Sequence, residues 1–312
     1  MKKLYFLFIL FSNLFYAQNS EDRRVYLDSL FKETENSDSP YYRIIEDENT
    51  NKEEYKFKTF YKSGKVYIEG NTRSNKSILQ NGFITTYFEN GNRKEEYYSD
   101  KGSIAGNQTA WYENGNKKYV KDYFKEKNEL ISTVRILQFW DINNVQKVID
   151  GNGYFEGEEN HCYEKGKLQN GLRIGKWEGV DKRFKIKFEE DYENGKLIKG
   201  VSMDSVSNEQ SYTSVRESAK PRKGYEHFYK YIGKKFRFTK KTERQSGKIV
   251  LSFIVEKNGT ISDIKVLKSA GEELDNEAIR LIESYPDWEP GKYRGRIVRV
   301  HYTIPITITA EQ

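Results

Sequence analysis

The chain has 312 residues, which is enough for two domains, and its formal net charge at neutral pH is +6. Charged residues make up 32% of the chain, so thin β layers are expected rather than a deep core, with 24 Tyr and 18 Phe residues to supply buried area. The charge is modest, and nucleic acid is not an expected partner because the chain is predicted below to be exported. The only cysteine, Cys162, excludes an internal disulfide and a lipid anchor near the N-terminus.

Residues 1–17 are predicted to be a secretory signal peptide. Lys2 and Lys3 precede an apolar run that ends at Phe15, and Ala17 marks the expected cleavage point. The run is shorter than the roughly 20 residues needed to span a bilayer. The sequence therefore predicts an exported protein, in the periplasm or associated with the outer membrane, without an integral membrane span. An uncleaved N-terminus that acts as an anchor stays open as an alternative.

Residues 18–55 are expected to be weakly ordered or helical. They contain more acidic than basic residues, and their apolar residues form one short stripe. The stripe consists of Val25, Leu27, Leu30 and Phe31. Regular structure is therefore expected to begin near residue 56.

From residue 56 to residue 200 the sequence repeats itself. Aromatic residues, two polar residues and a glycine recur, as in FYKSG at 60–64 and WYENG at 111–115. A degenerate copy of the motif, FWDIN, lies at 139–143. The glycines expected at the turns of the repeats are Gly64, Gly91, Gly115, Gly166 and Gly195.

Each repeat unit is expected to be a β-hairpin. Glycine permits the positive φ of a tight turn, and the aromatic side chains stack across neighbouring hairpins. A single hairpin is marginal in water, so the units should pair in one antiparallel sheet. The units resemble the MORN-repeat variant of bacterial exported proteins, and GNQTAWYENG at 106–115 is the closest copy. The resemblance implies a scaffold rather than an activity.

Residues 201–224 are predicted to be a linker. They are polar, with Ser, Asn and Lys prominent, and Pro221 lies near their end. A second, smaller domain is then expected over residues 225–312.

The second domain is predicted to be α+β. Apolar residues alternate over 249–255, Asn258-Gly259 predicts a hairpin turn, and the pattern resumes over 261–267. Apolar residues at helical spacing over 274–285 then predict a helix that the following proline ends. The overall expectation is a mainly β chain, in which a sheet of repeated hairpins precedes a small domain of two helices and three strands.

The last strand has the clearest period of two. Its apolar side is formed by Val298, Val300, Tyr302, Ile304, Ile306 and Ile308. Its polar side is formed by Arg299, His301, Thr303, Pro305 and Thr307. Because proline cannot donate a hydrogen bond to a neighbouring strand, Pro305 predicts that this strand lies at a sheet edge.

These elements resemble the C-terminal domain of TonB-like proteins. The family pattern appears here as FYKYIG at 228–233, GKIVLSFIV at 247–255, SAG at 269–271, WEPG at 288–291 and IPI at 304–306. The Tyr-Pro pair that follows the first helix in the family is replaced by residues 236–239. The resemblance implies a domain that captures a short segment of an outer-membrane transporter.

No constellation typical of an enzyme, a metal site or a cofactor site is found. His161 and Cys162 are adjacent, so in a strand they point to opposite faces, and further metal ligands at the usual spacing are missing. His227 and His301 are single histidines of the kind usually found at surfaces. Acidic runs such as residues 189–191 are expected to be solvated.

The expected function is non-enzymatic protein binding. An extended peptide can add to an exposed edge strand through main-chain hydrogen bonds. The residues expected to contact it are Arg296, Val298, Arg299, His301, Thr303 and Pro305. The expected partner is an envelope protein, for example a transporter segment, and a homodimer is also possible.

Two other functions stay open at this point. One is a TonB-type energy transducer whose N-terminus is retained in the inner membrane. The other is a structural protein whose repeats bind lipid or cell-wall polymer, with the C-terminal domain as a dimerisation module.

Overall fold

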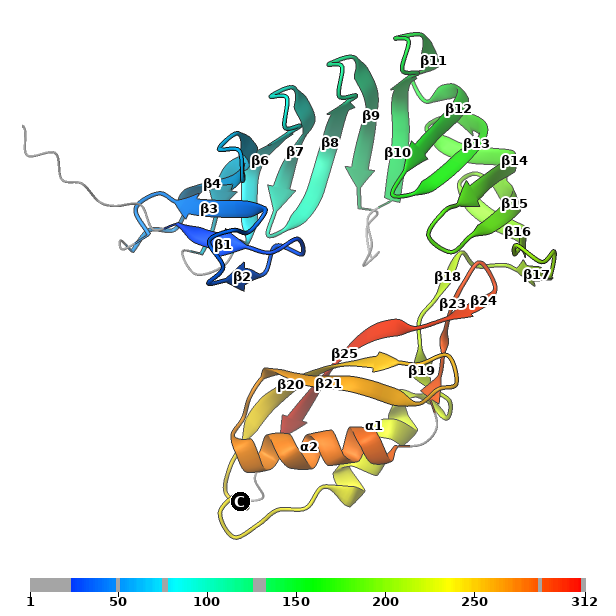
Figure 1. Cartoon of the computed structure of the whole chain (residues 1–312). Coiled ribbons are helices and arrows are strands. Elements are labelled where there is room, and N and C mark those ends of the chain that lie inside the picture. Colours follow the sequence, from blue (N-terminus) through cyan, green and yellow to red (C-terminus); the bar gives the residue numbers. More distant parts are fainter. Residues whose placement is uncertain (1–23, 49–50, 75–77, 126–132, 286–287, 310–312) are drawn as a thin grey trace, which may run out of the picture. The chain divides into compact units, whose positions relative to one another are not determined.

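The structure is a computed structural model that describes residues 24–48, 51–74, 78–125, 133–285 and 288–309 (Figure 1). The predicted signal peptide lies outside these residues. Within them, no helix has the length and apolar character needed to cross a membrane. The predicted fold class is confirmed, because hairpin strands dominate and two helices accompany the C-terminal sheet.

The chain divides into two compact units, residues 1–146 and residues 147–312. In the first unit, consecutive strands from β3 to β10 pair antiparallel, and β1 pairs with both β2 and β3. Its strands are β1 (Val25–Leu27), β2 (Glu33–Thr34), β3 (Tyr41–Ile45), β4 (Tyr55–Tyr61), β5 (Val66–Thr72), β6 (Gln80–Tyr87), β7 (Arg93–Asp100), β8 (Ser103–Trp111), β9 (Lys117–Phe124) and β10 (Thr133–Trp140).

The N-terminal segment differs from its prediction. Within residues 18–55, the described part forms three strands instead of a helix or weakly ordered chain. Val25 and Leu27 are two residues apart, which is the strand period as much as the start of a helical stripe. β3 also pairs with β4, and this pairing buries Ile45 opposite Phe57. The partner strand, which the local sequence does not contain, decides the conformation.

Within the described part of residues 56–146, four hairpins share one turn geometry. In the first, Tyr61 N donates to Lys65 O and Gly64 N donates to Tyr61 O, with Gly64 at φ 85°. The same pair of hydrogen bonds recurs at Gly91 and at Gly115, which also have positive φ. In the degenerate copy the equivalent residue is Asn144, at φ 63°, one residue beyond the FWDIN match. Asn tolerates the left-handed region better than most residues, so the turn survives without glycine.

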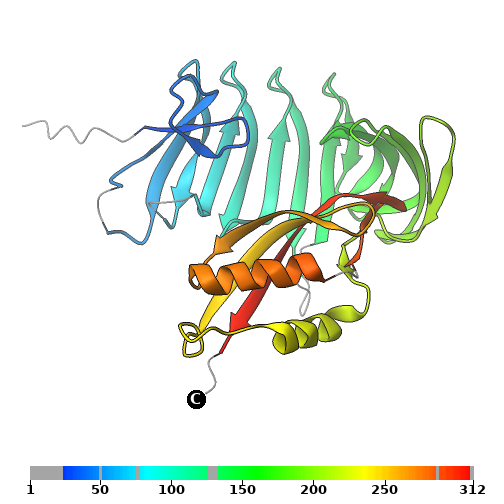
Figure 2. The ribbon, with the colours of Figure 1, turned by 60° about the horizontal axis from the view of Figure 1, so that its bottom comes forward.

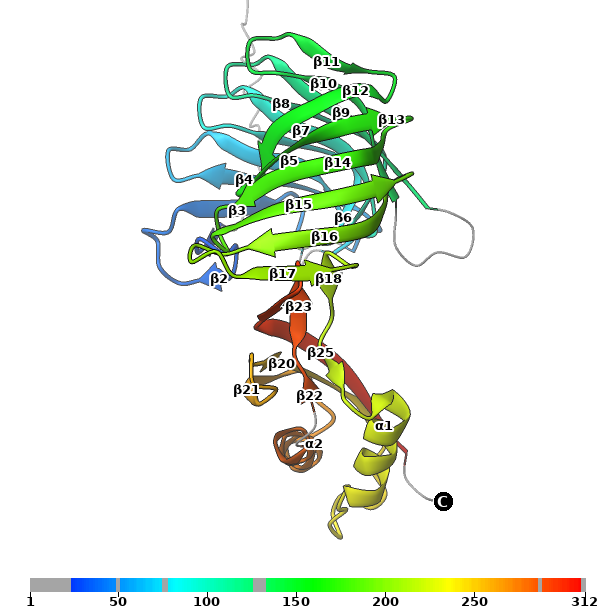
Figure 3. The same cartoon turned by 90° about the vertical axis from the view of Figure 1, so that its right-hand side faces the viewer.

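The second unit begins with another antiparallel ladder, in which consecutive strands from β11 to β17 pair with one another. Figure 3 shows β12 to β17 side by side. The strands are β11 (Gln146–Ile149), β12 (Asn152–Glu159), β13 (Cys162–Gln169), β14 (Leu172–Asp181), β15 (Ile186–Glu193), β16 (Lys196–Met203) and β17 (Glu209–Tyr212). Gly195 lies in the two-residue turn between β15 and β16, at φ 80°.

Gly166 does not lie in a turn, contrary to its prediction. It lies within β13, opposite Trp177 of β14. A Cβ atom at Gly166 would be 2.3 Å from a ring atom of Trp177, so the indole occupies the space of the missing side chain. Gly179 opposite Phe188 and Gly200 opposite Tyr212 repeat this arrangement. The regularly spaced glycines of these strands therefore include positions against which an aromatic ring packs, as well as turn positions.

The segment predicted as a linker also contains strands. β17 completes the ladder, and the two short strands β18 (Arg216–Glu217) and β19 (Lys220–Pro221) pair with strands near the C-terminus. Ala219 and Pro221 are buried. Backbone hydrogen bonds to distant partners hold these strands, so most of their side chains can be polar. The composition of the segment therefore resembles that of a loop.

The C-terminal domain has two helices against a three-stranded sheet. Its elements are α1 (Gly224–Lys235), β20 (Gly247–Val255), β21 (Ile261–Lys268), α2 (Glu272–Ser284), β22 (Trp288–Glu289), β23 (Gly291–Tyr293), β24 (Arg296–Val298) and β25 (Val300–Ile308). Both helices lie on the same side of the sheet (Figure 2). Phe228 and Ile232 from α1, Leu281 from α2 and Leu251 from β20 meet in one buried cluster. β21 and β25 are the two edge strands of this sheet.

Candidate functional site

β25 is an edge strand of the C-terminal sheet. The order of strands is β21-β20-β25, and β25 pairs antiparallel with β20 over nine residues, from Val300 to Ile308. No strand of the described residues pairs with its other side. This side therefore presents backbone groups that an added strand can use.

The side chains of β25 alternate as its sequence predicts. Ile304 and Ile306 are buried among the helices and the hairpin, whereas His301, Thr303 and Pro305 are exposed. The apolar side is thus committed to the core. Removal of a polar side chain from the other face leaves this packing unchanged.

Pro305 indicates which amides face outward. It lies opposite Val250 of β20, and its nitrogen carries no hydrogen. Proline is accommodated in a sheet where this nitrogen faces away from the partner strand. Since the backbone repeats every two residues, the N–H groups of His301 and Thr303 face outward with it.

Arg299 lies between β24 and β25, outside both strands. Its guanidinium binds Glu256, the residue that follows β20, and Nε and Nη2 are each 2.8 Å from a carboxylate oxygen. The hydrogen bonds from Arg299 hold the pKa of Glu256 below its usual range. Arg299 therefore marks the start of the exposed edge with an ion pair.

Arg296 and Val298 were expected to contact the bound segment, but they do not lie on β25. They belong to β24, in a separate small sheet of β18, β23 and β24. Arg296 Nη1 is 3.0 Å from Asp204 Oδ2, and its Nε donates to Ser202 Oγ at 3.0 Å. The structure brings His301, Thr303 and Pro305 together on one edge, but it does not bring Arg296 and Val298 to that edge.

An aromatic patch adjoins β25 that the sequence reasoning missed. The hydroxyls of Tyr302 and Tyr225 of α1 are 2.6 Å apart and hydrogen bond. Tyr225 and Tyr229, one turn apart on α1, are 45% and 44% exposed. Burial, followed by the bond to Tyr225, raises the pKa of Tyr302. Two tyrosines at a spacing of four, beside the apolar stripe of Phe228 and Ile232 on the same helix, were the available signal.

The elements that form this edge have known relatives. Residues 239–307 match the family model described as Gram-negative bacterial TonB protein C-terminal. A similar solved structure is the NMR solution structure of Helicobacter pylori TonB-CTD (residues 194–285), with 24% identity over 28% of this chain and 94% of that chain, and a TM-score of 0.23. No curated protein matches the chain. Residues 224–309 are called the TonB-like domain from here on.

The TonB-like domain is joined to the repeat strands of its own unit by a buried ion pair. The turn between β23 and β24 is formed by Arg294 and Gly295, both with positive φ. Arg294 Nε donates to Glu190 Oε1 of β15 at 2.8 Å, and the two side chains are 4% and 0% exposed. Glu190 was expected to be solvated, so the structure corrects that expectation. It also accepts hydrogen bonds from the hydroxyls of Tyr212 and Tyr192.

Further buried contacts surround this ion pair. Tyr293 donates to Asp181 Oδ2 at 2.8 Å, and Ser202 donates to the backbone oxygen of Arg294 at 2.8 Å. The Arg294 guanidinium lies 3.4 Å from the ring centroid of Phe188. Burial lowers the pKa of Arg294, but the hydrogen bond and the charge of Glu190, together with Tyr293 and Cys162, outweigh burial and hold this pKa above its usual range. These buried groups hydrogen bond to one another, and their arrangement fits a structural joint.

The remaining candidate residues lie apart. Cys162 Sγ is 3.8 Å from Arg294 Nη1, and burial raises the pKa of its thiol, so it is not an activated nucleophile. His227 Nδ1 is 3.2 Å from the Tyr285 hydroxyl. In the described residues, no group of three or more potential ligands could hold a metal ion.

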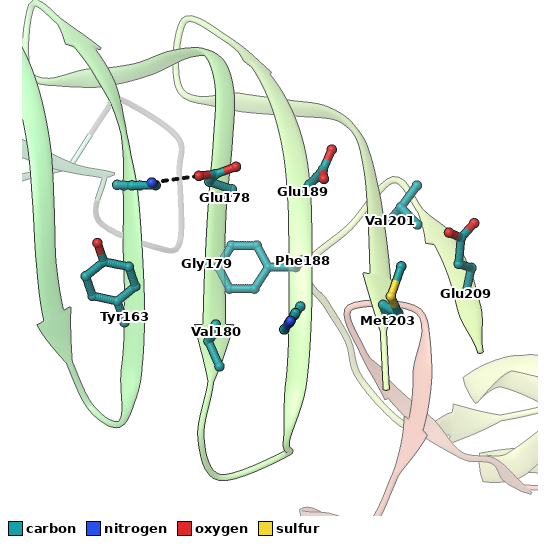
Figure 4. A pocket seen from close by; sticks show the side chains of 11 residues that line it. Tyr163, Glu178, Gly179, Val180, Phe188, Glu189, Val201, Met203 and Glu209 are labelled. Atoms are coloured by element: carbon teal, nitrogen blue, oxygen red, sulfur yellow. Dashed lines mark ion pairs between the residues drawn. The ribbon is translucent and has the colours of Figure 1, made fainter. Parts of the chain in front are cut away.

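A hollow of about 470 Å³ lies on strands β13 to β17 (Figure 4). Tyr163, Val180 and Met203 supply apolar surface to it. Glu178 of β14 lies directly opposite Glu189 of the adjacent β15. Its Oε1 forms an ion pair with Lys165 Nζ at 2.8 Å.

Proposed function

We propose that the protein is a non-enzymatic envelope protein that binds an extended segment of another envelope protein as an added strand along β25. The repeated hairpins act as the scaffold that carries the TonB-like domain. The observation that carries the proposal is the unpaired edge of β25. The apolar face of this strand packs on the core, and its opposite edge pairs with β20.

The length of the edge sets the length of the bound segment. Outward amides at His301, Thr303 and Thr307 supply hydrogen-bond donors, and Pro305 interrupts this row. A segment of about three to five residues is thus expected to pair by main-chain bonds. The adjoining Tyr225 and Tyr229 give an apolar platform for a side chain that projects from this segment.

The expected location rests on the family match at residues 239–307. Together with the expected signal peptide, this match supports export to the periplasm. It also supports an outer-membrane transporter segment as the class of partner, because the resemblance to TonB-like domains implies capture of such a segment. The similarity of the hairpins to MORN-type repeats supports the scaffold role.

The test uses proline and alanine at one position. Thr303→Pro removes an outward amide and leaves the apolar side intact, so it should weaken binding while the melting temperature stays close to that of the wild type. Thr303→Ala keeps the amide and is the matched control. The partner is recovered from an envelope extract, identified, and its segment is titrated as a synthetic peptide by calorimetry.

Tyr302→Pro tests the direction of the amides. Its N–H faces β20, so this change should lower stability. If Thr303→Pro folds and keeps full affinity for the peptide, strand addition at β25 is wrong. Binding would then be sought on the repeat strands.

One observation favours the structural alternative, in which the repeats bind lipid or cell-wall polymer. The hollow on β13 to β17 has the size of a ligand site, at about 470 Å³. Val180→Lys, which adds a charge to its apolar wall, should abolish polymer binding and leave peptide binding unchanged. Sedimentation with purified cell-wall polymer measures the first, and the same peptide titration measures the second.

A further inference from the structure

A second cavity, of about 440 Å³, is built entirely from residues of the first unit. It lies among β1 to β6, and its walls are mainly apolar. Leu27 and Phe57, each 1% exposed, form part of the wall together with Ile68 and Ile78. Its volume and its apolar lining are typical of small-molecule sites.

A buried arginine lines this cavity. Arg43 of β3 is 7% exposed, and its Nη2 lies 2.6 Å from Glu33 Oε1. Its Nε is buried and has no hydrogen-bond partner among the described residues. An unsatisfied buried N–H is costly and rare. Nε and Nη2 together form the side of a guanidinium that a carboxylate can bind with both oxygens, and Glu33 occupies only half of it.

The Glu33 carboxylate can leave Arg43 more easily than Arg43 can move. Its side chain is 53% exposed, whereas that of Arg43 is 9% exposed. The carboxylate can therefore turn into solvent at little cost, while Arg43 must stay. Among the described residues of the lining, only Arg43 and Glu33 are charged, so the departure of Glu33 leaves one positive charge there.

A strained aromatic residue also lines the cavity. Phe31 has φ 59° in a turn with the same hydrogen bonds as those of Gly64, Gly91 and Gly115. A bulky residue is an outlier at this backbone conformation. Its ring stacks on Tyr67 with centroids 5.3 Å apart, and Tyr67 lines the cavity as well. Strain of this kind persists where a side chain is needed in one place.

From these three observations we propose that the cavity binds a small amphipathic carboxylate. The ligand carboxylate takes Nε and Nη2 of Arg43 in place of Glu33. Its apolar part lies against Leu27, Phe57 and Ile68, and Phe31 covers it.

The test titrates the full chain with decanoate and with decanol by calorimetry. Decanoate should bind about tenfold more tightly than decanol, because a charge-assisted pair adds to the shared apolar contact. Arg43→Met should remove this difference and leave decanol affinity within about twofold. Glu33→Gln should strengthen decanoate binding only, since the competing carboxylate is gone.

Phe31→Gly keeps the proposal testable if Arg43→Met does not fold. Loss of the ring should weaken binding of both ligands about tenfold. The matched control is Asn144→Gly, which puts glycine at the same place in an equivalent turn and should leave both affinities unchanged. Equal affinity of the folded wild type for decanoate and decanol, or absence of decanoate binding, would overturn the proposal. A decanoate affinity that neither Arg43→Met nor Glu33→Gln alters would also overturn it.

Discussion

Arg294 Nε donates to Glu190 Oε1 at 2.8 Å, and this buried bond links residues 104 positions apart in the chain. It joins the turn of β23 and β24 to the middle of β15. Glu190 also accepts hydrogen bonds from two tyrosine hydroxyls. The TonB-like domain is therefore attached to the repeat strands of its unit by side chains as well as by the chain itself.

Loss of one member of this pair should be severe. Arg294→Met leaves the buried Glu190 carboxylate with Arg173, at 3.9 Å, as its remaining cation, and should lower the free energy of unfolding of the second unit by about 3 kcal/mol. Urea denaturation followed by circular dichroism measures it. Lys292→Met is the control, because Lys292 pairs with Glu217 at the surface and should cost less than about 1 kcal/mol. The double variant with Glu190→Gln should cost less than the sum of the two single changes.

Gly166→Ala and Gly233→Ala should have opposite effects. At Gly166 the new Cβ would lie 2.3 Å from the Trp177 ring and must displace it, at a cost of about 1–3 kcal/mol. At Gly233, within α1, nothing lies within 4 Å of the new Cβ, so alanine should stabilise by up to about 1 kcal/mol. Thermal melts report both changes. If alanine at 166 is neutral, the ring of Trp177 does not occupy this site.

The turn geometry predicts the effect of changes at Gly115. Gly115→Val should destabilise by about 1–2 kcal/mol or more, since φ is 87° there and a β-branched residue resists positive φ. Asn144→Gly, in the equivalent turn, should be neutral or slightly stabilising. The melting temperatures of the two variants are compared with that of the wild type. An unchanged value for Gly115→Val would contradict the turn assignment.

Alkaline pH should destabilise the first unit. Burial is the main cause that raises the pKa values of Tyr61 and Tyr87 to about 12, from an ordinary value of 10.0. The folded state then holds these protons more tightly than the unfolded state does, so their contribution is complete below about pH 10 and is lost between about pH 10 and 12. Unfolding midpoints across this range measure the slope. Phe at both positions should flatten it, and an unaltered slope would rule out these two groups as its source.

The strands in the supposed linker predict which fragment folds. A fragment of residues 214–312 retains β18 and β19, which pair with β23 and β22, and it retains the buried Ala219. It should unfold cooperatively and melt several degrees above a fragment of residues 225–312. Differential scanning calorimetry makes the comparison. Equal stability of both fragments would restore the linker interpretation.

Much of the fold could be predicted because its signals are local. Asn258-Gly259 marks a hairpin turn by itself, and the period of two over residues 300–308 identifies both the buried and the exposed side of β25. Pro305 alone indicated an edge, and the strand order agrees. Each of these depends on backbone preferences within a few residues, which any sequence displays directly.

The site was only partly predictable because its residues are arranged by contacts between distant segments. Arg296 and Val298 continue the sequence pattern of β25, yet a break at Arg299 places them in another sheet. Gly166 has the spacing of a turn glycine, but its position is set by the Trp177 ring on the next strand. The aromatic pair Tyr225 and Tyr302 meets across 77 residues.

By itself, then, the sequence determined the hairpins, the helices, the two faces of the last strand and its likeness to TonB C-terminal domains. These follow from φ preferences and from side-chain periods of two and 3.6 residues. The tertiary structure alone decided that Glu190 is buried against Arg294, that β18 and β19 are strands, and that Arg43 lines a cavity. The physical reason is that burial of a charge or pairing of a polar strand depends on partners far along the chain, and no local pattern records them.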